Sequence, residues 1–184
     1  MDEARIPPAP RPYPPEIEES LARLMGPGVE PLRLFRTLAQ NPRVLSRFLA
    51  GGLLDKGSIS LRERELAILR TTARCGSEYE WGVHVAFFAG KAGLTDEQVA
   101  SLAHGGAADP CWTPGEALLI RLCDELHETS TVSDALWSAL RAERSEEAML
   151  ELLMLAGSYR MVSYLTNALR LPREPYAARF PLSG

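Results

Sequence analysis

The sequence of 184 residues predicts an all-α protein. No segment shows a sustained alternation of apolar and polar residues, which half-buried strands would produce. Apolar residues instead recur every three or four positions, as they do on the buried face of a helix. Several of these stretches begin with a Ser/Thr-x-x-Glu/Gln pattern, in which the first and fourth residues cap the helix start. The length suits one compact domain.

The first predicted helices follow a proline-rich segment. Residues 1–15 hold six prolines and should be extended, either as a loose leader or as an arm on a neighbouring subunit. Ile6 and Tyr13 are the candidate anchors of such an arm. Apolar spacing then predicts three short helices, over residues 16–25, 32–40 and 44–54. Asn41 and Pro42 separate the last two, because Asn caps a helix and Pro suits its first position.

Two capping patterns define the central helices. Ser60 and Glu63 form the first, and Ser77 and Glu80 form the second. They predict helices over residues 61–74 and 78–93. In this interpretation Ser77 and Glu80 are simply a helix cap and its reciprocal partner, which is the alternative to a functional role for them.

The remaining apolar stretches complete the helical pattern. They predict helices over residues 99–104, 113–127 and 145–169, with a short one that begins at residue 133. The longest is apolar on more than one face, so we expect it at the centre of the fold or between subunits. Prolines then end the helical region. The chain therefore divides into a proline-rich arm (1–15), a single helical domain (16–171) and a C-terminal tail (172–184).

Composition excludes several classes of function. The net charge is −4 without a basic block, so nucleic acid is not an expected partner. No apolar run reaches the length of about 18 residues that a membrane span needs. No signal-peptide core follows the N-terminus, which makes the cytoplasm the expected location. Cys75, Cys111 and Cys123 are too far apart in sequence to suggest a disulfide framework or a thiol zinc site.

Ionisable, aromatic and thiol groups come together between residues 74 and 84. Ser77, Glu80 and His84 fall on one face of a helix, beside an apolar face. A carboxylate and an imidazole one turn apart can exchange protons in a partly dry pocket. Glu65 also lies on the apolar side of its helix, either as a boundary charge that reaches water or as the partner of an arginine. The alternative for His84 is a core histidine bonded to a carbonyl.

These residues resemble a known family. Arg62-Glu63-Arg64-Glu65-Leu66 and Glu78-Tyr79-Glu80-Trp81-Gly82-Val83-His84 are similar to segments of the carboxymuconolactone decarboxylase family, which shares the helical fold of the alkylhydroperoxidase AhpD. Shorter segments at 92–99, 124–127, 157–159 and 167–169 match in the same order. The resemblance covers about residues 40–170. It implies an AhpD-like helical bundle, a trimer or hexamer of identical chains, and a small-molecule substrate. No cofactor is expected, because the sequence contains no phosphate-cradling glycine loop.

The sequence departs from one branch of this family. The alkylhydroperoxidase branch carries a Cys-x-x-Cys seven and four positions before the histidine, and here those positions hold Ser77 and Glu80. The proton-relay glutamate and histidine of that branch align with Glu65 and His84. Cys75 lies two positions early and has no resolving partner nearby in sequence. The resemblance therefore favours the decarboxylase-like branch, in which acid–base groups act without a redox pair.

The resulting hypothesis is a cofactor-free lyase or isomerase that acts on a small carboxylated lactone or a related acid of aromatic catabolism. His84 would be the general acid/base, Glu80 would orient it, and Glu65 would be a second proton carrier. The residues expected around the substrate are Tyr79, Trp81, Ser77 and Cys75.

Two other classes of function stay open. One is a peroxide-reducing or thiol-redox protein that uses Cys75, and the other is a helical scaffold without catalysis. A metal shared by Glu80 and His84 is a weaker hypothesis, because two ligands do not make a site. His104 and His127 are expected to be surface or capping residues.

Overall fold

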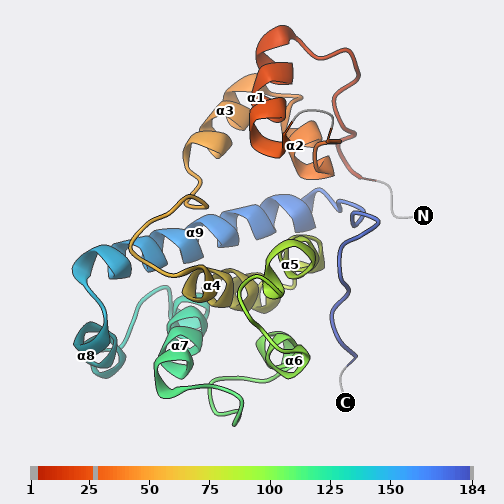
Figure 1. The fold of residues 1–184 in the computed structure, drawn as a ribbon. Helices are drawn as coiled ribbons and strands as arrows, with labels where there is room; N and C mark the ends of the chain where they lie inside the picture. The colour runs from red at the N-terminus through yellow and green to blue at the C-terminus, as the bar shows by residue number, and fades with distance from the viewer. Residues whose placement is uncertain (1–3, 27–28, 183–184) are drawn as a thin grey trace.

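The computed structural model describes residues 4–26 and 29–182, and every regular element within these ranges is helical (Figure 1). The predicted fold class is therefore confirmed. The helices are α1 (Pro15–Met25), α2 (Arg33–Leu38), α3 (Pro42–Ala50), α4 (Leu61–Arg74), α5 (Glu78–His84), α6 (Asp96–His104), α7 (Pro114–Thr129), α8 (Asp134–Glu143) and α9 (Glu146–Ala168). One turn of π-helix, Val85–Ala89, continues α5.

Most helices begin where local capping predicts. Complete capping boxes open α4, α6 and α7. The start of α5 differs, because the side chain of Ser77 makes no capping bond. Its hydroxyl is buried and lies 2.8 Å from the hydroxyl of Thr166 on α9. The interpretation of Ser77 and Glu80 as a capping box is therefore wrong, since packing against α9 holds the Ser77 hydroxyl elsewhere.

Two predicted helices end differently from expectation. The helix over 44–54 stops at Ala50, because Gly51 and Gly52 follow and glycine favours a helix end. The helix over 78–93 changes from α to π geometry directly after His84. Single π turns inside helices are frequent at functional sites. The helical period of the sequence does not reveal such a turn.

The helices α4 and α9 form the centre of the fold. α4 packs against α5, α6, α7 and α9, and α9 crosses the molecule between α1–α3 on one side and α6–α8 on the other (Figure 1). The main core is built from α4, α7, α8 and α9. A second apolar cluster joins α1–α3 to α5 and to the C-terminal end of α9. No helix in the described ranges is long and apolar enough to cross a membrane.

The proline-rich segment lies on its own chain. The Ala9 N–H donates to the carbonyl of Arg36 in α2, and the Tyr13 ring is buried in the cluster formed by α1–α3. Ile6, the other expected anchor, is largely exposed. The described part of the arm, residues 4–14, thus packs on the N-terminal helices of its own chain.

The segment after α9 is docked as well. The Ala178 N–H donates to the Gly82 carbonyl at 3.1 Å, and the Phe180 ring lies 4.9 Å from the Trp81 ring. Gly82 permits this approach, because a Cβ there would collide with the Ala178 carbonyl. These contacts cover one side of α5. The candidate site described below lies on its opposite side.

Candidate active site

The imidazole of His84 lies where three helices meet, and only 3% of the surface of His84 is exposed. Its Nδ1 is 2.8 Å from a carboxylate oxygen of Glu65 on α4. Its Nε2 is 3.0 Å from the hydroxyl of Tyr159 on α9 and 3.6 Å from Glu80 one turn earlier on α5. The predicted Glu65, Glu80 and His84 are thus brought together, and the histidine bonds to side chains rather than to a carbonyl.

Glu65 is fully buried and both of its oxygens are used. One oxygen accepts from the Arg64 guanidinium at 2.9 Å, and the other faces His84. Arg64 also donates to the carbonyl of Leu54, which fixes the guanidinium in place. A buried carboxylate is tolerated when it is paired in this way. Glu65 therefore does not reach water, and its role as the partner of an arginine is combined with a bond to the histidine.

The two carboxylates determine the charge of the imidazole. Burial alone would lower the pKa of His84, but Glu65 and Glu80 outweigh it and raise the pKa to about 9. His84 is therefore an imidazolium at neutral pH and can donate from both ring nitrogens. Burial, reinforced by the same two carboxylates, raises the pKa of Tyr159 well above that of a free phenol. Tyr159 thus stays a neutral hydroxyl beside a proton donor.

Glu80 differs from Glu65 in its contacts. Its separation of 3.6 Å from His84 exceeds a hydrogen bond, so Glu65 rather than the expected Glu80 holds the imidazole in place. The second oxygen of Glu80, Oε2, is buried and has no hydrogen-bond partner among the described residues. Buried polar atoms are almost always paired, so this unpaired acceptor is available to a proton-bearing group such as water or a ligand.

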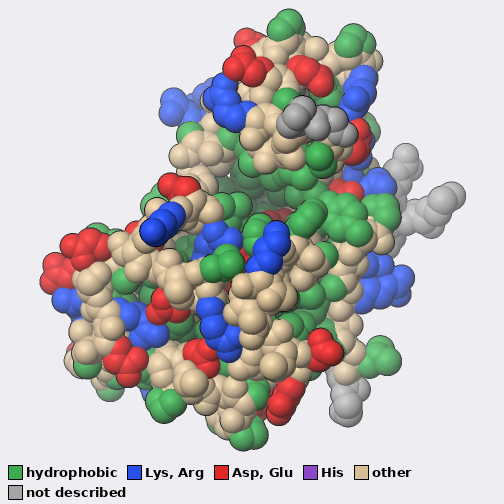
Figure 2. Space-filling model, in the orientation of Figure 1, with side chains coloured by type: hydrophobic (Ala, Val, Ile, Leu, Met, Phe, Trp, Pro, Cys, Tyr) green, Lys and Arg blue, Asp and Glu red, His purple; other side chains and the backbone are tan. Residues whose placement is uncertain are grey.

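Cations and an aromatic ring flank the site. The Phe88 ring, in the π turn, lies 5.3 Å from the His84 ring. The Arg64 guanidinium and the Lys91 ammonium lie over the Phe88 ring at 5.2 and 5.3 Å. Figure 2 shows a hollow lined by hydrophobic side chains between the N-terminal helices and the rest of the molecule, with Lys and Arg side chains beside it.

The four residues expected to line the substrate pocket lie elsewhere. Tyr79 donates to Glu174 at 2.7 Å and accepts from the Leu34 backbone, which ties α5 to the N-terminal cluster. Trp81 is buried in the main core. The Ser77 hydroxyl bonds that of Thr166, and the Cys75 sulfur lies beside His127 rather than His84. Successive residues of a helix point about 100° apart, so Tyr79 and Trp81, which adjoin Glu80 in sequence, cannot point in its direction.

Tyr159 is not among the residues that the sequence predicts for the site. Its spacing places it in the apolar stripe of the longest helix. The available signals were its hydroxyl, which needs a partner when buried, and its place in the Gly157-Ser158-Tyr159 segment that resembles the family. Neither signal indicates that the partner is His84, which is 75 residues away.

A second histidine cluster lies at the ends of α4 and α7. The Cys75 sulfur is 3.8 Å from Nδ1 of His127, which is half-buried rather than a surface or capping residue. Burial, Arg160 and Arg74 outweigh the nearby carboxylates and lower the pKa of His127. Burial raises the pKa of Cys75, so the thiol stays protonated at neutral pH. His104, in contrast, is exposed as predicted and lies 2.7 Å from the Pro181 carbonyl.

Metal binding finds no additional support in the geometry. Within the ranges that the structure describes, no group of three or more His, Cys, Asp or Glu side chains is arranged to hold an ion. The pair of Glu80 and His84 thus gains no third ligand of these types there.

The fold and the buried acid–base site define an AhpD-like helical protein. Residues 40–122 match the model of the carboxymuconolactone decarboxylase family. This segment of the chain is therefore similar to the carboxymuconolactone decarboxylase family, and the resemblance seen in the sequence is confirmed.

Solved structures with low sequence identity share the fold. An uncharacterized peroxidase-related protein from Silicibacter sp. TM1040 aligns with a TM-score of 0.81 and 16% identity over 98% of this chain and 100% of its own. The AhpD core of an uncharacterized peroxidase-related protein from Ralstonia eutropha JMP134 aligns at 0.77 and 17%, over 94% and 95%. The debrominase Bmp8 in complex with 2,3,4-tribromopyrrole aligns at 0.71 and 14%, over 95% and 94%. A sequence comparison with curated proteins finds no match.

Proposed function

We propose that this protein is a cofactor-free acid–base enzyme, a lyase or isomerase, whose substrate is a small carboxylated lactone or a related acid of aromatic catabolism. One observation carries the proposal. His84 is an imidazolium held by the buried Glu65 and hydrogen-bonded to the neutral hydroxyl of Tyr159. No thiol of the described residues contacts this histidine, so its chemistry is proton transfer.

The arrangement suits protonation of a carbanion or enolate. When a carboxylate leaves as CO2, the electrons of the broken carbon–carbon bond stay on the substrate, and the new enolate needs one proton. In the proposed step Tyr159 donates its hydroxyl proton to that carbon and takes one from Nε2 of His84. Glu65 stabilises the imidazolium before the transfer and keeps the ring oriented. Water returns the proton to the site after the product leaves.

The surroundings favour an anionic substrate. Arg64 and Lys91 place positive charge beside the Phe88 ring, and the hollow of Figure 2 supplies apolar surface. We infer that the substrate enters from this hollow and that its proton-bearing group bonds the unpaired Oε2 of Glu80. Charge attracts the carboxylate, and the apolar walls strengthen the electrostatic interactions once water is displaced.

The test is turnover of a panel of carboxylated lactones and unsaturated acids, followed by CO2 release and by product absorbance. His84→Gln and Tyr159→Phe should each lower turnover by about a hundredfold or more, with helical circular dichroism unchanged. His127→Gln is the matched control, because it removes a histidine outside the site. Full turnover in either site variant would overturn the assignment. Turnover of no acid in the panel would instead favour the scaffold hypothesis.

Peroxide reduction through Cys75 is the competing function. Two of the similar structures are described as peroxidase-related proteins, which is the reason to test it. Peroxide consumption with a dithiol reductant should not depend on Cys75, because its thiol is protonated and lies with His127 rather than His84. Consumption that is lost in Cys75→Ser would replace the acid–base assignment by a thiol-based one.

We further propose that the chain forms a homo-oligomer, a trimer or hexamer, through α9. Four large apolar residues of this helix are exposed and follow a 4-3-4-3 spacing with Gly157 between them: Leu150 (69%), Met154 (52%), Met161 (45%) and Tyr164 (59%). Such a stripe is typical of a helix that packs against another helix. Light scattering should give a multiple of the chain mass for the wild type and a smaller mass for Met154→Glu. A monomeric wild type at micromolar concentration would contradict the proposal.

A further inference from the structure

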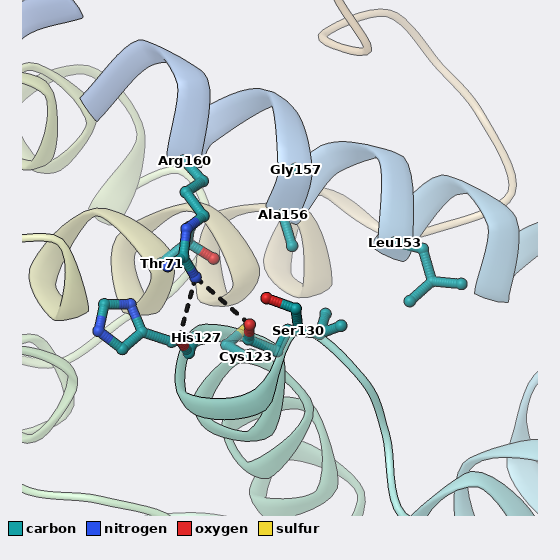
Figure 3. A pocket seen from close by; sticks show the side chains of 9 residues that line it. Thr71, Cys123, His127, Ser130, Leu153, Ala156, Gly157 and Arg160 are labelled. Carbon is teal, nitrogen blue, oxygen red and sulfur yellow. Dashed lines mark hydrogen bonds between the residues drawn. The ribbon is translucent and has the colours of Figure 1, made fainter. Parts of the chain in front are cut away.

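A cavity of about 200 Å³ lies between α4, α7 and α9, away from His84 (Figure 3). Its apolar wall comes from Leu126, Leu153 and Ala156. Its polar lining includes Thr71 of α4 and Arg160 of α9. None of the side chains that line it belongs to the cluster of Glu65, Glu80, His84 and Tyr159. It is therefore a separate feature that the proposed acid–base function does not use.

Arg160 brings a positive charge to the cavity without a negative partner. Its Nη1 donates to the carbonyls of Leu126 and His127 at 3.3 and 3.0 Å, and its Nε donates to the Tyr164 hydroxyl at 2.8 Å. No carboxylate in the described part of the chain forms an ion pair with it. Figure 3 shows how the bonds of Nη1 link this side chain of α9 to the end of α7. Nη2 is left as a fixed donor at the cavity.

Thr71 supplies a second, independent observation. Its residue is only 6% exposed, and its hydroxyl oxygen has no hydrogen-bond partner among the described residues. A helical threonine usually bonds a carbonyl of the preceding turn, as the adjacent Thr72 does with Ile68. An unpaired buried hydroxyl is costly, and a bound ligand removes that cost. The cavity thus has an oriented cation and an unused hydroxyl beside an apolar wall, and the side chains of Cys123, His127 and Ser130 complete its lining.

We propose that this cavity is a binding site for a short-chain aliphatic carboxylate. One carboxylate oxygen pairs with the Arg160 guanidinium, and the Thr71 hydroxyl donates to the carboxylate. The alkyl chain contacts Leu126, Leu153 and Ala156. A volume of 200 Å³ corresponds to about seven water molecules at roughly 30 Å³ each, which suits a ligand of about six or seven heavy atoms. An acid of four or five carbons has this size.

The experiment uses butyrate as the probe and butyramide as its neutral control. Both are titrated into the full-length protein while the imidazole resonances of the histidines are followed by NMR. Butyrate should shift the resonance of His127, whose carbonyl holds Arg160, and leave that of His84 unchanged. The His127 response separates this cavity from carboxylate binding at the acid–base site. Butyramide should cause no saturable shift, because it carries no charge for the guanidinium.

Two variants test the named contacts by calorimetry. Thr71→Val keeps the shape of the side chain and removes only the hydroxyl, so the Kd for butyrate should rise by about tenfold. Arg160→Gln should remove measurable binding, because it removes the charge. Equal affinity of wild type and Thr71→Val, equal binding of butyrate and butyramide, or a shift confined to His84 would each overturn the proposal. No saturable shift of His127 at all would show that the cavity holds water only.

Discussion

Two histidines of this protein have neighbours of opposite charge. His84 lies between Glu65 and Glu80, which raise its pKa to about 9 despite burial. His127 lies near Arg160 and Arg74, which act with burial to lower its pKa. The same side chain is therefore a charged proton donor in one cluster and a neutral ring in the other. At His84 the charge of the packed neighbours outweighs burial, whereas at His127 burial is the largest cause and the two arginines reinforce it.

The comparison also concerns the thiol. Cys75 lies with the neutral His127, and no imidazolium is there to stabilise a thiolate. The imidazolium of His84 has carboxylates and a phenol for partners instead. The fold thus keeps the acid–base groups and the candidate redox thiol in separate clusters. This separation adds a spatial argument to the absence of the Cys-x-x-Cys pattern.

The largest expected effect is that of Glu65→Gln. This change removes the charge shared by Arg64 and His84, so the free energy of unfolding should fall by about 3–5 kcal/mol. Turnover should also fall by about a hundredfold or more, because the imidazolium loses its stabilising partner. Urea unfolding and the acid-turnover assay measure the two effects. Glu80→Gln is the matched control and should cost less in both, and the reverse order would show that Glu80 is the main partner.

The second prediction is the pH dependence of stability on the alkaline side. The pKa of His84 rises from 6.5 in the unfolded chain to about 9 in the fold. Its contribution is fully present below pH 6.5 and is lost as the pH rises through 9, which amounts to about 3 kcal/mol. Urea unfolding of wild type and His84→Gln between pH 6 and pH 10 measures it. Parallel curves for the two proteins would show that His84 is neutral in the fold.

The third prediction concerns His127, whose contribution to stability has the opposite pH dependence and a smaller size. Its pKa is lowered in the fold, so the unfolded chain binds the proton more readily. Its contribution to stability is present above the unfolded pKa and is lost as the pH falls below it. His127→Gln should therefore flatten the loss of stability between pH 7 and pH 5, with little change above pH 7. A change in the stability of this variant only above pH 7 would contradict a lowered pKa of His127 in the fold.

The smallest effect concerns thiol reactivity. Burial raises the pKa of Cys75, so its alkylation under native conditions should be slower at pH 7 than in urea and should accelerate as the pH is raised. Cys123 is the internal reference, because burial raises its pKa to about 12 and it should react later still. Mass spectrometry of alkylated peptides separates the two sites. Fast alkylation of Cys75 at pH 7 would indicate an activated thiolate and favour the redox function.

The sequence by itself determines the helices and one half of the site. Helix starts depend on bonds within four residues, so the capping patterns at Ser60, Thr95 and Thr113 predict the starts of α4, α6 and α7. The proximity of Glu80 and His84 likewise follows from one helical turn. The apolar side of α4 correctly places Glu65 inside the fold.

Only the tertiary structure decides how the groups are paired. Glu65 reaches His84 because α4 packs on α5, and Tyr159 reaches the opposite ring nitrogen because α9 closes over both. The same packing turns Tyr79 towards Glu174 and leaves Cys75 with His127. Helical spacing defines the direction of a side chain on its own helix but not which helix it will face. The pKa of each histidine depends on that choice, because charge interactions weaken with distance and with access to water.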